Sequence, residues 1–194
     1  MFILMIACIL DYRQFKDVKQ STLANYQAKN IALAIETILY LRNNGFLKIS
    51  DSAIYQGIAA SKWKGRFEVV SNNPLVIIDG AHNDEGMRAL VESCQKYDKI
   101  QILFSALKDK PTGKMIEDLL TLSDNIIVTE FDFYRASSAE DLANGYPVTI
   151  IKDYKEAIET LLSKEADLHL ICGSLYFISI VREYFMKKGE STKK

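Results

Sequence analysis

The sequence lacks the compositional extremes that mark unusual classes of protein. Its 194 residues include only three prolines, three cysteines and two histidines, and 24 basic against 25 acidic residues leave a formal net charge of -1. Few prolines and 48% hydrophobic residues exclude a disordered, collagenous or low-complexity chain. Nucleic-acid binders usually carry a basic surplus, so no nucleic-acid partner is expected. The length suits one full domain and a smaller part.

The cysteines and the first apolar run bear on the compartment. Cys8, Cys94 and Cys172 are odd in number and widely spaced, which argues against a disulfide framework and against a metal site, and favours a reducing compartment, the cytoplasm. The apolar run Met1–Leu10 is shorter than the roughly 20 residues of a membrane span, and it has neither the basic start nor the cleavage site of a signal peptide. We predict a buried strand there and no membrane partner; the alternative is an artefact of where the sequence starts.

Helical spacing dominates the first third of the chain. Apolar residues three and four apart predict a helix from Ala28 that ends near the stop residues 43–45. A second, shorter helix follows, and its candidate N-cap is Ser50 or Asp51.

The rest of the chain alternates between strand-like and helix-like segments. A change of pattern near residues 60–63 predicts two domains, 1–60 and 61–190. The expected strands are 75–79, 100–105, 125–131, 148–151 and 168–172. The expected helices are 84–96, 112–122, 138–144, 154–163 and 175–186. Alternation of this kind, with strands apolar on both faces, predicts an α/β fold: a mostly parallel sheet with helices on both faces.

The segment at 76–83, Val-Ile-Ile-Asp-Gly-Ala-His-Asn, is the strongest candidate for chemistry, because ligands bind beyond the carboxyl ends of parallel strands. Asp79 is suited to accept hydrogen bonds from sugar hydroxyls or to orient a cation. His82 is suited to contact a carboxylate or a phosphate. The structural alternative is that Asp79 only caps the turn and Asn83 only caps the next helix.

Three further residues are candidate ligand contacts, each with a structural alternative. Arg66 stands beside a glycine and its planar fork of donors suits a phosphate; the alternative is a surface pair with Glu68. Asn30 shares a helical face with Gln27, and two amides can hydrogen-bond a base or ribose edge; the alternative is a solvated face. Ser174 follows the last strand, where backbone donors receive an anion, or it is an ordinary cap.

Several signatures are absent from the sequence. It has no GxxxxGK[ST] phosphate loop, no GxGxxG after the first strand, no HExxH and no GxSxG. This chain therefore does not hold a nucleoside triphosphate through a phosphate loop of its own, and a dinucleotide site of the usual kind is disfavoured.

Five segments, in this order, resemble those of folylpolyglutamate synthases, which belong to the Mur ligase superfamily. They are Tyr-Gln-x-x-Asn at 26–30, Trp-x-Gly-Arg-Phe-Glu at 63–68, Asp-Gly-Ala-His-Asn at 79–83, Ser-Ala-Leu-Lys-Asp-Lys at 105–110 and Gly-Ser-Leu-Tyr at 173–176. The resemblance runs from about residue 23 to residue 186. It implies that residues 1–60 are the end of a central ATP-binding domain and that 61–190 form the C-terminal α/β ligase domain.

The resemblance also implies an activity. In this family ATP and Mg²⁺ drive the ligation of L-glutamate to the γ-carboxyl of a folate's glutamate tail through an acyl phosphate, releasing ADP and phosphate. The implied partners are ATP, glutamate and reduced folates. Asn30, Arg66 and Asp79 are the implied ATP contacts, with Arg66 at the phosphates and Asp79 at the ribose. His82 is the implied glutamate contact, and Ser174 is a further candidate.

The resemblance has departures and a competitor. The family's phosphate loop, magnesium ligands and most of its folate site belong to a region upstream of Met1, so we expect no catalytic residue in this portion and no activity from this chain by itself. Ser105 stands where a glycine is usual, and Asp84 where proline is frequent. The competing reading is a non-catalytic α/β module that binds a small anion or a partner protein.

Overall fold

The computed structural model describes residues 8–191 except residues 21, 23 and 25. The chain divides into two compact units, Met1–Trp63 and Lys64–Lys194. Most of the strand expected at Met1–Leu10 lies outside the described residues.

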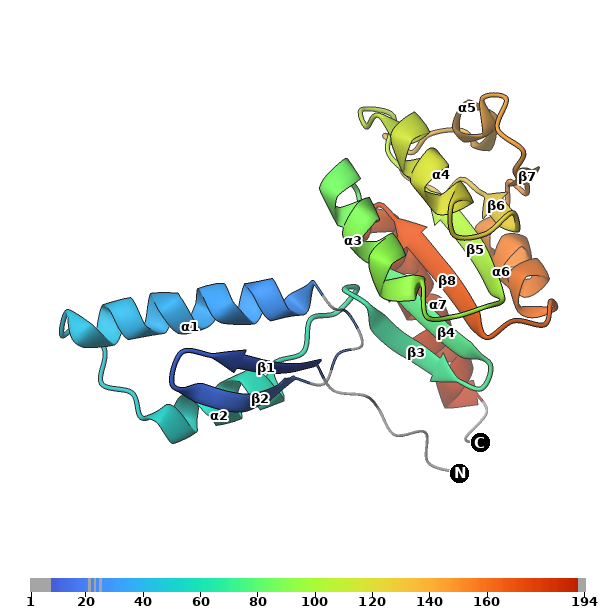
Figure 1. Cartoon of the computed structure of the whole chain (residues 1–194). Helices are drawn as coiled ribbons and strands as arrows, with labels where there is room; N and C mark the ends of the chain where they lie inside the picture. Colours follow the sequence, from blue (N-terminus) through green and yellow to red (C-terminus); the bar gives the residue numbers. More distant parts are fainter. Residues whose placement is uncertain (1–7, 21, 23, 25, 192–194) are drawn as a thin grey trace. The chain divides into compact units, whose positions relative to one another are not determined.

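The first unit contains a small antiparallel sheet and two helices (Figure 1): β1 (Cys8–Tyr12), β2 (Phe15–Gln20), α1 (Gln27–Asn43) and α2 (Asp51–Ala60). Both helices lie where the apolar spacing predicts them. Ser50 is confirmed as the N-cap of α2, since its side chain accepts a hydrogen bond from the Ala53 N–H at 3.2 Å. The core of this unit contains Phe15, Val18, Ile31, Ile35, Leu39, Ile54 and Ile58.

The hairpin of β1 and β2 differs from the sequence prediction. Ile9 in β1 is 58% exposed, so the prediction of a buried strand is wrong at this position. Successive side chains of a strand point to opposite faces, and Leu10 and Tyr12 pack against the core of this unit, which leaves Ile9 on the other face. In β2 the buried side chains are Phe15 and Val18, three residues apart, because Asp17 adopts a φ of 52° and breaks the strand period of two.

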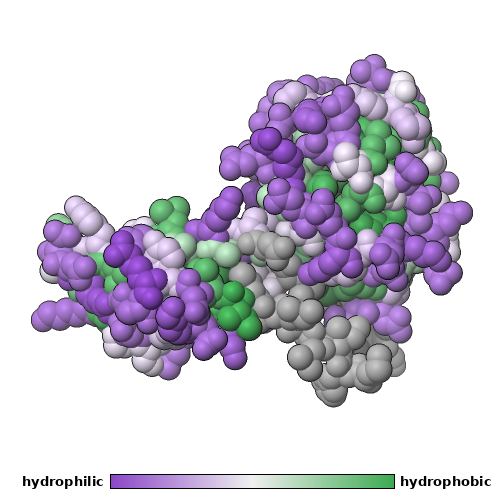
Figure 2. All heavy atoms as spheres, in the orientation of Figure 1, coloured by the Kyte–Doolittle hydropathy of each residue, from purple (hydrophilic) through white to green (hydrophobic). Residues whose placement is uncertain are grey.

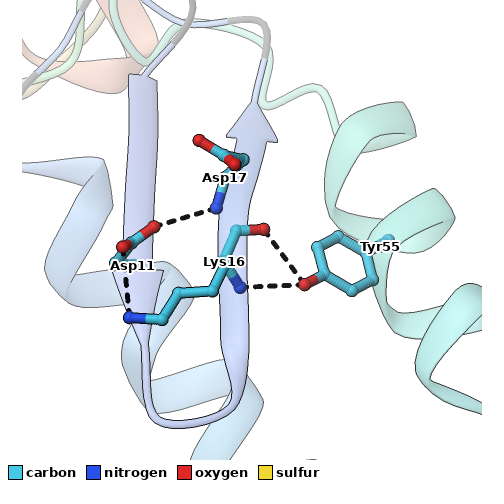
Figure 3. Close-up of polar contacts among 4 residues, drawn as sticks. All are labelled: Asp11, Lys16, Asp17 and Tyr55. Atoms are coloured by element: carbon cyan, nitrogen blue, oxygen red, sulfur yellow. Dashed lines mark hydrogen bonds and ion pairs between the residues drawn. The ribbon is translucent and has the colours of Figure 1, made fainter.

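The hairpin is fastened to α2 by a tyrosine hydroxyl (Figure 3). The Tyr55 hydroxyl accepts a hydrogen bond from the Lys16 N–H at 2.9 Å and donates one to the Lys16 carbonyl at 3.0 Å. Within the hairpin, Asp11 accepts hydrogen bonds from the Asp17 N–H at 2.9 Å and from the Lys16 ammonium at 3.2 Å. These two bonds hold the pKa of the Asp11 carboxyl below its usual value.

The second unit is built on a six-stranded sheet with the order β3-β4-β8-β5-β6-β7. Its strands are β3 (Glu68–Asn72), β4 (Leu75–Asp79), β5 (Ile100–Ser105), β6 (Ile126–Val128), β7 (Thr149–Ile150) and β8 (Leu168–Gly173). Its helices are α3 (Asp84–Cys94), α4 (Thr112–Leu120), α5 (Ala139–Ala143), α6 (Tyr154–Leu162) and α7 (Leu175–Ser191). All pairs are parallel except β3 with β4, so the mostly parallel α/β fold is confirmed. The antiparallel edge strand β3 was not expected.

Helices cover both faces of this sheet. Figure 1 shows α3 and α4 on one face, with α6 and α7 on the other. The core between the sheet and the second pair of helices contains Val76, Ile78, Leu103, Ile171, Ala157, Ile158, Phe177 and Val181. Hydrophilic residues cover most of the face seen in Figure 2, with apolar residues showing between them. No helix in the described part of the chain has both the length and the apolar run that a membrane crossing requires.

Candidate ligand-binding site at the carboxyl ends of the strands

Three parallel strands of the second unit end together beside a cavity. In the sheet register Asp79 of β4 pairs with Cys172 of β8, and Ser105 of β5 pairs with Gly173 of β8. The cavity has a volume of about 210 Å³ and is lined by Ala81, His82, Phe104, Ala106, Leu107, Lys110, Met115, Arg135, Gly173, Ser174, Leu175 and Tyr176. The sheet edge predicted to carry the chemistry therefore has a cavity, and His82 and Ser174 line it.

Asp79 points into the protein and holds a loop. Asp79 is only 2% exposed, and its carboxylate accepts a hydrogen bond from the Phe67 N–H at 2.7 Å. The same loop is tied to the strand end a second time, because the Gly80 N–H donates to the Gly65 carbonyl at 2.8 Å. Phe67 has a φ of 47°, a conformation that costs free energy for a residue with a side chain. This geometry favours the structural alternative for Asp79, that of holding a turn.

The Gly80 carbonyl brings two of the predicted site residues together. It accepts hydrogen bonds from Nη1 of Arg66 and from Nδ1 of His82, each at 2.9 Å. A carbonyl oxygen only accepts, so Nδ1 of His82 carries a proton and Nε2 is the atom left to meet a ligand. A Cβ on Gly80 would lie 2.1 Å from Cδ2 of Leu175, so the Leu175 side chain would have to move to make room for it.

The surface pair proposed as the alternative for Arg66 does not form, because Glu68 is engaged elsewhere. The Glu68 carboxylate accepts hydrogen bonds from the Gly65 N–H at 2.7 Å and from Nε of Arg182 at 2.9 and 3.1 Å. The Arg66 guanidinium has five N–H donors, and its bond to Gly80 uses one of them. This favours the reading of Arg66 as an anion contact.

Ser174 caps a helix and also lines the cavity, the position that its predicted anion role requires. Its Oγ accepts a hydrogen bond from the Tyr176 N–H at 3.2 Å, which caps the start of α7, and the residue lines the cavity. The turn before it is tight, since a Cβ on Gly173 would lie 1.9 Å from the Ser105 carbonyl oxygen and the φ of Gly173 is +123°. The Ser105 hydroxyl donates to the Thr129 carbonyl at 2.6 Å, so this side chain is used inside the protein.

A charged rim was missed as a site by the sequence reasoning. Nη2 of Arg135 lies 2.8 Å from Oδ2 of Asp109, and Nζ of Lys110 lies 4.0 Å from the same atom. The hydrogen bond from Arg135 holds the pKa of Asp109 below its usual value, and the same bond raises the pKa of Arg135. The sequence did carry a signal for this rim, because the segments 105–110 and 131–135 each follow an expected strand.

Asn30 lies in the first unit, where its side-chain amide donates to Oε1 of Gln27 at 2.9 Å. The two amides predicted to share a helical face therefore bind one another, and Gln27 is 5% exposed. Asn30 also lines an apolar groove of about 340 Å³ in this unit, formed with Gln20, Gln27, Ile31, Ala34, Ile38, Ile49, Ala53, Ile54, Gly57, Ile58, Ser61 and Trp63.

Two of the described thiols lie buried in the second unit. Cys94 and Cys172 are free and buried. Burial first, and then the nearby charge of Asp79, raise the pKa of Cys94 to about 12 and that of Cys172 well above its usual value, so both stay protonated at neutral pH. Among the described residues no three His, Cys, Asp or Glu side chains gather as a metal site requires.

Comparison with known proteins assigns the chain to a family. Residues 65–175, more than half of the 194, match the family described as "Mur ligase, glutamate ligase domain". The chain belongs to the Mur ligase family. The match runs from the Gly65 loop to the start of α7 and covers every residue that lines the cavity except Tyr176.

The relatives of this Mur ligase chain are folylpolyglutamate synthases, and they match it over their C-terminal part. A dihydrofolate synthase/folylpolyglutamate synthase of Bacillus subtilis is 37% identical over 87% of this chain and 41% of its own length. The folylpolyglutamate synthase of Mycobacterium tuberculosis, solved with ADP and AMPPCP, superposes with a TM-score of 0.79 at 25% identity, over 88% of this chain and 42% of that one. A bifunctional enzyme solved with Mn, AMPPNP and L-glutamate bound gives 0.76 at 27%, over 90% and 42%. The chain thus spans about two fifths of the length of these relatives.

Proposed function

We propose that this chain is the C-terminal part of an ATP-dependent ligase that joins L-glutamate to the γ-carboxyl of folate glutamates through an acyl phosphate, with release of ADP and phosphate. The observation that carries this proposal is the Gly80 carbonyl, which accepts hydrogen bonds from both Arg66 and His82, and His82 lines the cavity. A guanidinium and an imidazole so placed are suited to a phosphate and a carboxylate. The relatives' names and the L-glutamate bound in one of them support the same reaction.

Three residues are proposed to contribute to ATP binding. Arg66 contacts phosphate, because its remaining donors form the planar fork that suits phosphate oxygens. Asp79 remains assigned to the nucleotide, and with 2% exposure its contribution passes through the loop that it holds, where Arg66 resides. Asn30 is the third proposed nucleotide contact, on the resemblance to the family, and its amide stands at an apolar groove of the first unit.

The glutamate is proposed to enter the cavity of the second unit. A volume of about 210 Å³ suits a small amino acid rather than a folate. His82 contacts the glutamate through Nε2, and Ser174 offers its hydroxyl as a further donor from the start of α7. These residues bind and orient substrates; they do not themselves transfer the phosphoryl group.

Magnesium does not fit the described residues, since no three acidic or imidazole side chains gather among them. We therefore derive no step through a metal from this chain. The sequence also has no GxxxxGK[ST] segment to order the phosphates, which leaves transition-state charge without its usual stabilisation. The chain alone is expected to form no ADP above a buffer control when given ATP, L-glutamate and a reduced folate.

The second candidate function is a non-catalytic module that binds a small anion or a partner protein. The observation that favours it is that three of the candidate contacts, Asp79, Ser174 and Asn30, each make hydrogen bonds that serve the fold.

One experiment separates the two functions. The matching two fifths of the Bacillus subtilis relative is replaced by this chain, and ADP formation is measured with and without L-glutamate and a reduced folate. The ligase proposal expects turnover that needs all substrates and falls steeply with Arg66→Ala. A folded chimera that binds ATP but shows no glutamate-dependent ADP formation contradicts the proposal and favours the module. Turnover by the chain alone, abolished by Arg66→Ala, contradicts the expected inactivity.

A further inference from the structure

One stripe of α7 lies against the loop that carries Arg66. A Cβ on Gly65 would lie 3.0 Å from Cγ2 of Ile178, so this part of the helix is already in contact with the loop. Arg182 follows Ile178 by four positions, which places both on one face of the helix. The stripe therefore continues to a guanidinium, and Nε of Arg182 donates a hydrogen bond to Oε1 of Glu68 at 2.9 Å.

The two chain neighbours of Arg66 each have their backbone N–H held by a carboxylate. The Phe67 N–H donates to Asp79 at 2.7 Å, and the Gly65 N–H donates to Oε2 of Glu68 at 2.7 Å. Both neighbours have a positive φ, 70° at Gly65 and 47° at Phe67, and these bonds hold the backbone in that conformation. Two carboxylates thus fix the direction in which the Arg66 side chain leaves the chain.

Glu68 is the carboxylate nearest to Arg66 along the chain, yet it is bound to Arg182. Nε of Arg182 lies 2.9 Å from Oε1 and 3.1 Å from Oε2 of Glu68, and the two side chains are 27% and 20% exposed. A partly buried pair is screened less by solvent than an open one. With its negative charge balanced by Arg182, Glu68 stays at the Gly65 N–H, and the Arg66 guanidinium donates to the Gly80 carbonyl instead.

We propose that Arg182 is a positioning residue for Arg66: it holds the Glu68 carboxylate at the Gly65 N–H and so keeps this carboxylate from pairing with Arg66. The Arg66 guanidinium is thereby kept for an anionic ligand. The inference rests on the proposed function for the class of that ligand, a phosphate. Arg182 lies beyond the residues 65–175 that match the family, so the family match does not assign it this role.

The competing reading is that the ion pair of Arg182 and Glu68 only fastens α7 to β3. A pair with that role would affect the stability of the unit, and its effects on substrates would not depend on Arg66. The two readings differ in how strongly Arg182 is coupled to Arg66, so the test compares single and double variants.

The first measurement follows the Arg66 side chain in the whole chain by heteronuclear NMR, with its Nε–H signal assigned by its loss in Arg66→Lys. Arg182→Gln releases the charge of Glu68, so we expect this signal to shift. Arg182→Gln/Glu68→Gln removes that charge as well, and the signal is expected to return to its wild-type position. The matched control Lys187→Gln removes another cation of α7 that pairs with a glutamate, Glu183, and should leave the signal unchanged.

The second measurement uses the chimera with the Bacillus subtilis relative. Arg182→Gln is expected to raise KM for ATP about three- to thirtyfold and to leave KM for L-glutamate unchanged within about twofold. Adding Glu68→Gln is expected to reverse most of this rise. Arg66→Ala/Arg182→Gln is expected to be no more impaired than Arg66→Ala, because no guanidinium remains to be positioned. If Arg182→Gln does not fold, Arg182→Lys takes its place; it keeps the charge but lacks Nε, and a smaller rise in KM is expected.

Three results would overturn the positioning role of Arg182. They are an Arg66 signal that is the same in wild type and Arg182→Gln, losses of Arg66→Ala and Arg182→Gln that multiply in the double variant, and a defect of Arg182→Gln that Glu68→Gln does not reverse. The NMR measurement needs neither ATP nor turnover. A chimera without activity therefore counts against the ligase proposal, while the Arg66 signal still decides on Arg182.

Discussion

The residues at the carboxyl ends of the strands fall into two groups that do different things, a buried group, called the floor, and a partly exposed group, called the rim. The floor consists of Asp79, Ser105 and Gly173, which are buried and bind backbone groups of neighbouring loops or approach them closely. The rim consists of His82 and Arg135, which reach the cavity with part of their surface exposed. Position 82 comes only three positions after position 79, yet the carboxylate at 79 holds the fold and the imidazole at 82 faces a ligand. Substitutions on the floor should therefore lower the free energy of unfolding, and those on the rim should weaken ligand binding.

The largest effect is expected at Gly173. In Gly173→Ala the new Cβ would meet the Ser105 carbonyl oxygen at 1.9 Å, and neither backbone can move without breaking the pairing of β5 with β8. We expect a loss of about 4 kcal/mol or more in the free energy of unfolding, measured by urea denaturation followed by circular dichroism. Gly57→Ala on α2, where the added Cβ meets nothing within 4 Å, is the control and should stabilise by up to about 1 kcal/mol. Equal stability of the two variants would contradict the structural role given to the floor.

Asp79→Ala is expected to come next. It removes a hydrogen bond to a charged group and leaves the buried Phe67 N–H without that acceptor, which costs about 2 to 3 kcal/mol of unfolding free energy. Asp98→Ala, at an exposed aspartate, is the matched control and should change stability by less than about 0.5 kcal/mol. If Asp79→Ala and Asp98→Ala have the same free energy of unfolding while the affinity of Asp79→Ala for ATP drops, Asp79 belongs to the rim and meets the nucleotide directly.

His82 should behave in the opposite way. In the chimeric enzyme His82→Ala is expected to lower kcat/KM for L-glutamate by about ten- to a hundredfold, the equivalent of one charged or strong contact, with ATP kinetics and the melting curve little changed. His82→Asn keeps a donor for the Gly80 carbonyl but lacks Nε2, so it should be as impaired as His82→Ala. Recovery of activity in His82→Asn would show that the histidine acts only by holding the turn.

The smallest effect is expected at Asp109, which pairs with Arg135 on the open rim. Its pKa lies below the ordinary 3.8, so the pair stabilises the fold fully above about pH 4 and the contribution is lost as the pH falls through the lowered pKa. Asp109→Asn should change Tm at pH 7 by no more than about 1 °C, because exposed pairs are screened by solvent. It should also flatten the fall of Tm below pH 4. An unchanged acid slope would mean that the pair is not populated in solution.

The sequence predicted the parts of the fold that have long periodic signals. The helices α1 and α2 and the five parallel strands were found because buried strands and amphipathic helices have distinct spacing. The strand β3 was missed because an edge strand that is only partly buried has no continuous apolar run. The strand β2 was missed because the positive φ of Asp17 disturbs its alternation.

The candidate site was predictable in its location more than in its detail. The rule that ligands meet the carboxyl ends of parallel strands led to His82 and Ser174, which line the cavity. The direction of Asp79 was not predictable, since a carboxylate at a strand end can turn to solvent or to a loop 12 residues away in the chain. The position of Arg135 at the cavity was not predictable, because it depends on the contact between its loop and the loop at 105–110, which local sequence does not encode.

The place of β8 in the sheet has a consequence for how the protein is made. Of the described strands, β8 comes last in the chain and so leaves the ribosome after the others, yet it lies between β4 and β5 and is the only link among them between the halves β3-β4 and β5-β6-β7. Until residue 173 has emerged, the facing edges of β4 and β5 have no partner and the register that aligns Asp79 with Ser105 does not exist. Closure of the sheet therefore waits for contacts more than 60 residues apart in sequence, a topology that folds slowly and exposes unpaired edges to aggregation meanwhile.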